Sequence, residues 1–205
     1  DVKTAEQIVS SFKEVVVAPS YTEDSLNILR TKKNLRILSV GELNSPSVTL
    51  VEKPIVGGRL IQQRDLSSLS SKDLQVVTKI EPTPAQIETM LFAWKVVKHV
   101  KSNAIVFATG TETVGLGMGQ VSRVDAVRLA SIKAVEHSEN KTPKGAVMAS
   151  DAFFPFPDAL ENAAEAGISA VIQPGGSIND DAVIDAANNL DISMVFTGTR
   201  CFKHD

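Results

Sequence analysis

The second half of the chain alternates strands and helices at the spacing of repeated β-α-β units. The predicted elements are strands at 104–108 and 113–117, a helix at 123–137, a strand at 145–149, a helix at 158–166, a strand at 169–172, a helix at 179–189 and a strand at 193–196. Such alternation favours parallel strands with helices on both faces of the sheet. The sequence therefore predicts an α/β fold built on a three-layer sheet.

The first half is less regular but contains one more β-α-β unit. Its predicted helices are 4–13, 23–32, 71–74 and 84–100, and its predicted strands are 15–18, 35–40, 48–51 and 59–62. Thr22 and Thr83 are good N-caps, and Pro84 suits the first position of the longest helix. We place a domain boundary after residue 82, which gives an N-terminal α/β part (1–82) and a C-terminal core (83–205). One continuous domain is the alternative.

Composition excludes several classes of protein. The 205 residues carry a formal net charge of -3, so the chain lacks the basic field that non-specific nucleic-acid binding needs. No apolar run approaches the roughly 20 residues that span a bilayer, and we expect no membrane partner. The single cysteine, Cys201, cannot form an internal disulfide, and no Cys-x-x-Cys motif is present to hold zinc.

No secretory signal peptide is recognisable at the start of the chain, which opens with Asp1 and polar residues. We therefore expect a cytoplasmic protein. The alternative is an organelle such as a plastid, with a transit peptide upstream of this sequence.

The loop after the strand at 145–149 has an unusual composition. It holds three phenylalanines and two prolines between Asp151 and Asp158. Phenylalanine and proline form a stiff apolar wall for a planar ring, and a neighbouring carboxylate accepts hydrogen bonds from ring N–H groups. The alternative is a hydrophobic lid over the core, with Asp158 as a helix N-cap.

Two later loops also suit a ligand. Gly175 and Gly176 let the backbone approach a ligand at the start of a helix, although an ordinary turn capped by Ser177 or Asn179 is the alternative. In the terminal segment, Arg200 and His204 suit an anion, because an arginine fork matches the oxygens of a phosphate. The alternative is a frayed tail.

Two other motifs carry weaker signals. The glycines at 115, 117 and 119 resemble a dinucleotide fingerprint, but no acidic residue follows at the end of the next strand to hold a ribose. The Lys98-His99 pair suggests a general base, but both residues fall inside a predicted helix, and an ordinary core or surface role in that helix is favoured.

Five motifs in one order identify a family. They are Lys101-Ser102-Asn103-Ala104-Ile105-Val106, Gly117-x-Gly119-Gln120-x-Ser122-Arg123-Val124, Ser150-Asp151-Ala152-Phe153-Phe154-Pro155-Phe156, Gln173-Pro174-Gly175-Gly176-Ser177-Ile178 and Arg200-x-Phe202-x-His204. Together they closely resemble the C-terminal half of AICAR formyltransferase, which shares a bifunctional purine-biosynthesis protein with IMP cyclohydrolase. The resemblance runs from about Glu14 to His204.

The resemblance implies an enzyme of de novo purine biosynthesis that moves a formyl group from 10-formyltetrahydrofolate to the amine of AICAR. It implies a cytidine-deaminase-like fold without the deaminase zinc, no required metal (a monovalent cation is an option), and a homodimer. The family's catalytic Lys-His pair lies on the other half of the formyltransferase region, so the rest of the same polypeptide is an expected partner. The alternative is a stand-alone nucleotide- or folate-binding module without catalysis.

The resemblance also assigns roles to individual residues. Asn103 supports the reacting centre; the nucleotide contacts are Arg123, Phe153, Arg200 and Phe202; the pterin contacts are Val124, Pro155, Asp158 and Ser177; and His204 supports the terminal turn. One departure from the family pattern lies beside these residues: Pro157 stands where the family usually has arginine.

Overall fold

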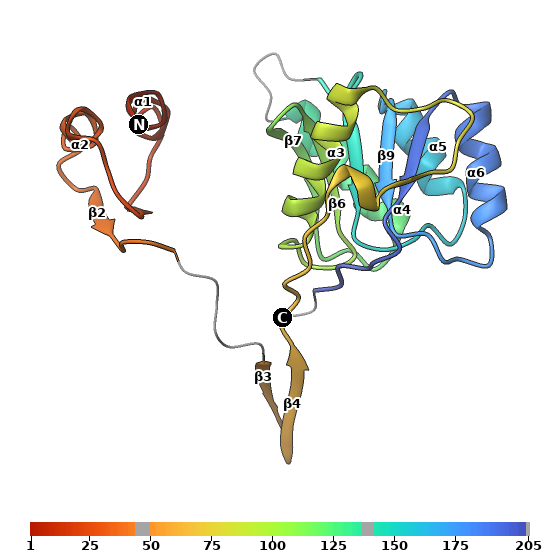
Figure 1. Cartoon of the computed structure of the whole chain (residues 1–205), viewed down its shortest axis with the longest axis horizontal. Coiled ribbons are helices and arrows are strands. Elements are labelled where there is room, and N and C mark those ends of the chain that lie inside the picture. The colour runs from red at the N-terminus through yellow and green to blue at the C-terminus, as the bar shows by residue number, and fades with distance from the viewer. Residues whose placement is uncertain (44–49, 137–141, 204–205) are drawn as a thin grey trace. The chain divides into compact units, whose positions relative to one another are not determined.

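The computed structural model describes residues 1–43, 50–136 and 142–203, and the chain divides into two compact units, Asp1–Arg64 and Asp65–Asp205 (Figure 1). The division therefore falls between Arg64 and Asp65 and not after residue 82. Residues 65–82 go with the second unit because β5 (Gln75–Val76) pairs with β10 (Ser193–Phe196) at the edge of its sheet.

The first unit contains the predicted β-α-β element. Strands β1 (Val15–Ala18) and β2 (Arg36–Ser39) are parallel, and α2 (Glu23–Leu29) connects them. Thr22 caps α2, as predicted, with its hydroxyl oxygen accepting from the Ser25 amide. Helix α1 (Val2–Val9) contacts α2. It starts before the predicted residue 4 because the Asp1 carboxylate caps it, and it ends before the predicted residue 13.

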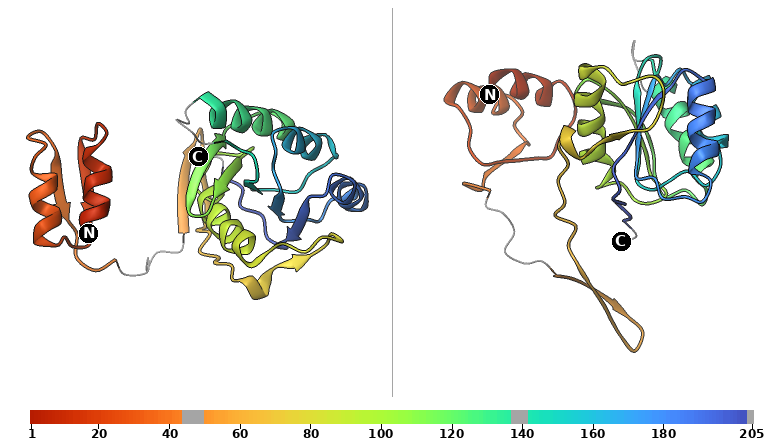
Figure 2. Two further views of the ribbon diagram at one scale, coloured as in Figure 1. Left: turned by 90° about the horizontal axis from the view of Figure 1, so that it is seen from above. Right: turned by 45° about the vertical axis from the view of Figure 1, so that its right-hand side comes forward.

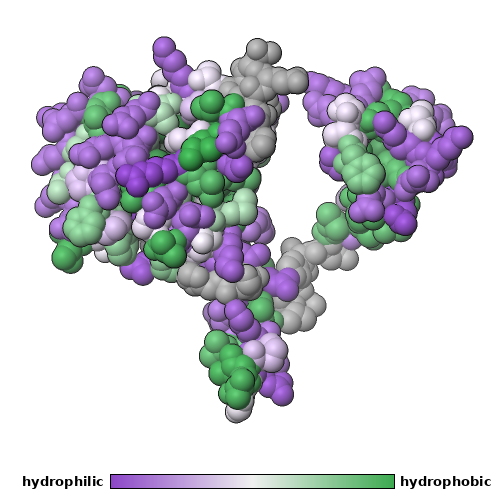
Figure 3. Space-filling model, turned by 180° about the vertical axis from the view of Figure 1, so that it is seen from behind, coloured by the Kyte–Doolittle hydropathy of each residue, from purple (hydrophilic) through white to green (hydrophobic). Residues whose placement is uncertain are grey.

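A β-hairpin is the last element of the first unit along the chain. Strands β3 (Leu50–Ile55) and β4 (Gly58–Gln63) pair antiparallel around a turn at residues 56–57, and every residue of both strands is exposed. Apolar and polar side chains are mixed on the hairpin surface (Figure 3).

The second unit is built on a mixed sheet. In its described residues, six strands lie in the order β5-β10-β9-β8-β6-β7. The strands not yet placed are β6 (Ile105–Thr109), β7 (Glu112–Gly117), β8 (Val147–Ser150) and β9 (Ala170–Gln173). Strands β8, β9 and β10 are parallel, whereas β6 runs antiparallel to both of its neighbours. The α/β class is therefore confirmed, with an antiparallel pair and an antiparallel edge strand added to the parallel centre.

Helices cover both faces of this sheet, as Figures 1 and 2 show. They are α3 (Pro84–Val97), α4 (Arg123–Glu136), α5 (Asp158–Glu165) and α6 (Asp180–Asn189). Alternate strand residues face two separate cores: Phe107 and Met148 pack with α4, α5 and α6, whereas Val106 and Ala149 pack with α3. This alternation is the period-two pattern of a sheet buried on both sides, and it produces the predicted three layers.

Glycines allow α4 to lie very close to β7. A Cβ atom on Gly115 would meet the Ala130 carbonyl oxygen at 2.3 Å, and one on Gly117 would meet the Ala126 carbonyl oxygen at 1.8 Å. No side chain fits at such distances, so these glycines serve helix–strand packing. The structure thus explains the glycine spacing without a dinucleotide.

The capping signals around α3 are confirmed. Thr83 and Gln86 form a capping box, with the Gln86 side chain accepting from the Thr83 amide, and Pro84 is the first helical residue. The helix ends at Val97, before the predicted residue 100, and Lys98 is its C-cap. Ser70 and Asp73 likewise form a capping box around the short 3₁₀ helix η1 (Ser71–Asp73). Among the described residues, no helix is long and apolar enough to cross a membrane.

Candidate functional site

Five loops meet at one edge of the second unit's sheet. The parallel strands β8, β9 and β10 all end there. Ile105 at the start of β6 pairs with Ser150 at the end of β8 and with Gly117 at the end of β7. The segments 101–104 and 118–122 therefore reach the same edge as the three loops that follow the parallel strands.

Two of these loops are joined directly. The Asn179 side-chain amide, at the N-terminus of α6, donates to the Pro155 carbonyl oxygen at 2.7 Å. The Phe- and Pro-rich loop therefore lies beside the glycine loop. Three of the four residues assigned to the pterin lie on these loops or where they end: Pro155, Asp158 and Ser177. The fourth, Val124, is on α4.

The predicted pterin residues differ in exposure. Asp158 is exposed as the first residue of α5, and its carboxylate accepts from the Ala159 amide at 2.8 Å. The alternative in which Asp158 is the N-cap is wrong, because Pro157 holds that position. Ser177 is half-buried and accepts from the Asn179 amide at 3.1 Å, whereas Val124, also half-buried, packs against the core beneath α4.

The terminal segment places an arginine against two aromatic rings. The Arg200 guanidinium carbon lies 4.9 Å from the centre of the Phe153 ring and 5.9 Å from that of Phe202. Both distances fall within the range of cation–π attraction. Three of the residues assigned to the nucleotide are therefore brought together, although they come from two loops. His204 lies outside the described residues.

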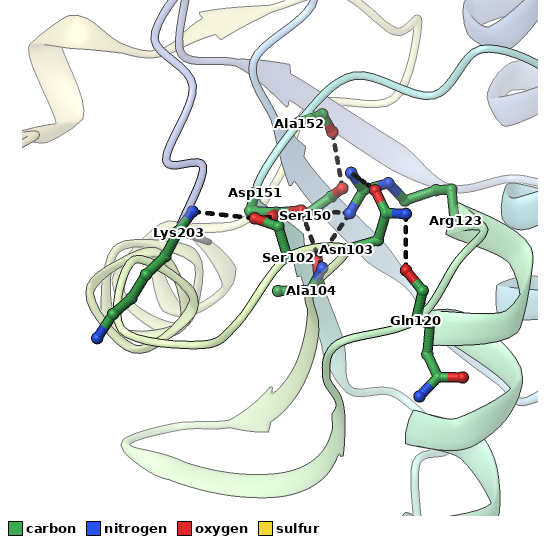
Figure 4. A network of polar contacts seen from close by, with 9 residues as sticks. All are labelled: Ser102, Asn103, Ala104, Gln120, Arg123, Ser150, Asp151, Ala152 and Lys203. Carbon is green, nitrogen blue, oxygen red and sulfur yellow. Dashed lines mark hydrogen bonds and ion pairs between the residues drawn. The ribbon is translucent and has the colours of Figure 1, made fainter. Parts of the chain in front are cut away.

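The fourth residue assigned to the nucleotide, Arg123, is directed into the protein (Figure 4). Its side chain is 6% exposed and forms an ion pair with Asp151, whose carboxylate is fully buried. The guanidinium also donates to the Ala104 carbonyl oxygen and to Oδ1 of Asn103, each at 3.0 Å. The predicted nucleotide contact of Arg123 stays a prediction, and the bonds that the structure gives this side chain are internal.

Asn103 connects this network to the surface of the site. Its Oδ1 accepts from Arg123, and its Nδ2 donates to the Gln120 carbonyl oxygen at 2.8 Å. A side-chain amide has two N–H donors and two acceptor lone pairs. The half-buried Asn103 thus retains one donor and one acceptor for a reacting group, while Arg123 and Gln120 fix its orientation.

Asp151 and Ser102 are residues of the site that the sequence analysis did not assign. The Asp151 carboxylate accepts from the Ser102 hydroxyl, from the Ala104 amide at 3.1 Å and from Arg123. Both residues lie inside the quoted motifs. The signal that could have found Asp151 is an acidic residue directly after a buried strand, because a buried carboxylate needs a cationic partner.

The terminal segment is anchored on this network. The Cys201 amide donates to the Asp151 carbonyl oxygen at 2.9 Å, and the Lys203 amide donates to Oγ of Ser102 at 3.0 Å. Cys201 is 3% exposed and belongs to the core beneath α3. Burial, together with the negative charge of Asp65, raises the pKa of the Cys201 thiol to about 12. The thiol is therefore protonated at neutral pH and is a poor nucleophile.

The Lys98-His99 pair lies just after α3 and not inside it, and the structure gives Lys98 a structural contact. The Lys98 ammonium forms an ion pair with Asp65 at 3.0 Å and donates to the Ser67 carbonyl oxygen at 2.7 Å. His99 is exposed just beyond α3. Burial opposes ionisation of Asp65, but the hydrogen bonds from Ser67 and Lys98 outweigh it and lower the pKa of this carboxyl.

A surface cavity of about 530 Å³ occurs elsewhere, in the first unit. Its lining consists of Phe12, Lys13, Glu14, Lys33, Asn34, Leu35 and Arg36. None of the residues assigned to a ligand lines it, so we base the candidate site on the loops of the second unit. Among the described residues, no group of three or more His, Cys, Asp or Glu side chains is arranged to hold a metal ion.

Comparison with known proteins decides the family. The family described as AICARFT/IMPCHase bienzyme matches residues 1–133. The chain belongs to this family. Relatives named bifunctional purine biosynthesis protein PurH match the whole chain, with 50% identity over 210 residues in Rhizobium rhizogenes and 51% over 207 residues in Caldicellulosiruptor saccharolyticus. The chain spans about two fifths of the length of these AICARFT/IMPCHase relatives, at 39% of each.

A comparison of structures gives a distant likeness. The crystal structure of dCMP deaminase from the cyanophage S-TIM5 matches 55% of this chain and 98% of its own chain, with a TM-score of 0.38 and 15% identity. A likeness this distant leaves the cytidine-deaminase-like fold of this AICARFT/IMPCHase member an expectation from the sequence.

Proposed function

We propose that this chain forms one half of the AICAR formyltransferase site, where AICAR and 10-formyltetrahydrofolate bind. The observation that carries the proposal is the placement of Arg200 against Phe153 and Phe202 at the sheet edge where the ligand loops meet. A guanidinium that stacks on rings keeps its N–H donors in its own plane, where they can hold a phosphate. The Phe153 ring also offers a face to the imidazole of AICAR.

The folate is assigned to the neighbouring pair of loops. The exposed Asp158 carboxylate accepts hydrogen bonds from pterin N–H groups, and its negative charge strengthens these bonds. Ser177 adds a hydroxyl group to the same site. Pro155 supplies an apolar wall, and the Asn179 bond holds the two loops together.

The chemical step needs three contributions. The amine of AICAR is a weak nucleophile, so the transfer requires alignment of the two substrates, removal of a proton and stabilisation of a tetrahedral oxyanion. The free N–H of Asn103 suits the oxyanion or the carboxamide of AICAR. By family resemblance, proton transfer belongs to a Lys-His pair on the other half of the formyltransferase region. We therefore expect the chain alone to bind substrates without turning them over.

The test combines binding with turnover. Calorimetric titration of the 205-residue chain should detect AICAR, and Arg200→Ala should weaken the binding. A formyl-transfer assay should show turnover only after the remaining part of a PurH relative is added. A folded chain that binds neither AICAR nor folate contradicts the proposal. Binding with no turnover in any combination supports the alternative, a nucleotide- or folate-binding module without catalysis.

A further inference from the structure

The segment after β10 alternates enclosed and exposed residues. Cys201 is 3% exposed, and Lys203 is half-buried. Arg200 and Phe202 are exposed, and both lie near the Phe153 ring. The backbone contacts at positions 201 and 203 therefore set where the side chains at 200 and 202 point.

Ser102 makes two of the contacts that hold this segment, and Figure 4 draws the one between its hydroxyl and Lys203. Its amide donates to the Lys203 carbonyl oxygen at 2.9 Å, and its hydroxyl oxygen accepts from the Lys203 amide at 3.0 Å. The third contact, from the Cys201 amide to the Asp151 carbonyl oxygen, is made by the backbone alone.

The direction of the Ser102 hydroxyl is imposed by its neighbour. An ionised carboxylate only accepts hydrogen bonds, so in this contact the Ser102 hydroxyl is the hydrogen-bond donor and Asp151 is the acceptor. Its lone pairs are then left for the Lys203 amide. The buried guanidinium of Arg123 balances the charge of Asp151 and fixes the carboxylate from the other side.

We propose that Ser102 is a positioning residue for the nucleotide: its hydroxyl, oriented by the Asp151–Arg123 pair, holds the terminal segment so that Arg200 and Phe202 flank Phe153. The identity of the ligand rests on the proposed function. We call the contacts of Ser102 with Lys203 the clamp, because they hold residues 200–203 in place. The clamp does not depend on the proposed function, and it can be measured without any ligand.

The test is Ser102→Ala in the 205-residue chain. The rate at which iodoacetamide alkylates Cys201 reports opening of the clamp, and we expect it to rise about tenfold, equivalent to about 1.4 kcal/mol. AICAR affinity should fall about tenfold while folate affinity changes little, because the folate loops are joined through Asn179 and not through Ser102. A general structural defect would weaken both ligands alike.

The matched control is Ser169→Ala. Ser169 is a half-buried serine, less enclosed than the buried Ser102, and its hydroxyl also joins two segments: it donates to the Gly145 carbonyl oxygen and accepts from Gln86. It precedes β9 and so lies at the sheet edge opposite the site. We expect the control to leave both the alkylation rate and the AICAR affinity unchanged.

A second variant reaches the same contact from the other side. Lys203→Pro removes the amide that Ser102 accepts from, while the Ser102–Asp151 bond is kept. It should reproduce the faster alkylation even if Ser102→Ala does not fold. An unchanged alkylation rate in the folded variants overturns the clamp, and equal losses of AICAR and folate overturn the positioning role. If the unmodified chain binds no AICAR, the proposed function fails, whereas the alkylation rates still decide the clamp.

Discussion

The Asn179 side-chain amide donates to the carbonyl oxygen of Pro155, with 2.7 Å between nitrogen and oxygen. This bond joins the loop after β8 to the loop after β9, and the three residues assigned to the pterin on these loops depend on the alignment it provides. Asn179 and Pro155 are 24 residues apart in sequence, so the bond is a tertiary contact and no local interaction substitutes for it.

Replacing Asn179 should therefore weaken folate binding. Asn179→Ala removes the donor, and a single hydrogen bond contributes about 0.5–1.5 kcal/mol, which predicts up to about tenfold lower folate affinity. Asn179→Asp keeps the shape but turns a carboxylate toward the Pro155 carbonyl oxygen, so it should bind folate no better than the alanine variant. Fluorescence titration measures the folate affinity of both variants. Unchanged affinity in both would show that the two loops keep their alignment without the Asn179 bond.

Substitution of Arg200 should act selectively on AICAR. Arg200→Ala removes a charge-assisted bond worth about 1.5–3 kcal/mol, and folate affinity should change little. Arg200→Lys keeps the charge but loses the planar fork that stacks on Phe153, so it should restore only part of the affinity. Calorimetry with each ligand separates these outcomes. Equal weakening of both ligands would make Arg200 structural.

Asp158→Asn should lower folate affinity without changing the thermal midpoint. The amide cannot match the acceptor strength of a carboxylate toward pterin N–H groups. Asp158 is exposed, and Pro157 holds the N-cap position, so the fold loses little. Thermal melting beside folate titration checks both parts, and normal folate binding by this variant would remove Asp158 from the site.

Cys201 should react slowly with thiol reagents in the folded chain. Burial raises the pKa of this thiol to about 12, so little thiolate forms at pH 8. The same shift favours the folded state up to the ordinary thiol pKa of about 8.5, and this contribution is lost as the pH rises further toward 12. The absorbance released by an aromatic disulfide reagent measures how much of the Cys201 thiol has reacted. We expect complete reaction only when denaturant unfolds the chain. Reaction at the rate of a free thiol in the native chain would contradict this.

The Asp65–Lys98 pair should stabilise the second unit only above acidic pH. The pKa of Asp65 is lowered in the folded chain, so the contribution is present above the unfolded pKa of about 3.9 and disappears as the pH falls through the folded pKa. The carboxylate is 41% exposed, and solvent screening limits the effect to about 0.2–1 kcal/mol. Urea unfolding of Asp65→Asn should therefore differ from the unmodified chain at pH 7 and converge with it near pH 3. A difference that persists at low pH would assign the effect to something other than charge.

Elements governed by local signals were predicted well. Capping residues such as Thr22 and Thr83 marked helix starts, and the alternation of strands and helices indicated a sheet covered on both faces. Strand β5 was missed because a two-residue strand has no sequence period of its own and exists through its pairing with β10. The unit boundary was misplaced for the same reason, since that pairing attaches residues 65–82 to the second unit.

The candidate site was predicted only in part. The resemblance pointed to Arg200, Phe153 and Phe202, and the structure brings them together. It did not indicate that Arg123 is buried against Asp151, because that pairing joins the start of α4 to the end of β8 across the sheet. Residue type alone does not tell an arginine that binds a ligand from one that neutralises a buried acid.

The bare backbone of Gly117 has a consequence for chemistry several residues away. A methyl group at this position would collide with the Ala126 carbonyl oxygen and push α4 away from β7. Ala126 lies less than one helical turn from Arg123. Tilting α4 would draw the guanidinium away from Asp151 and leave a buried carboxylate without its counter-ion. The absence of a side chain at Gly117 thereby lets Arg123 reach Asp151, and a substitution chosen only to strengthen the strand would first weaken a buried ion pair.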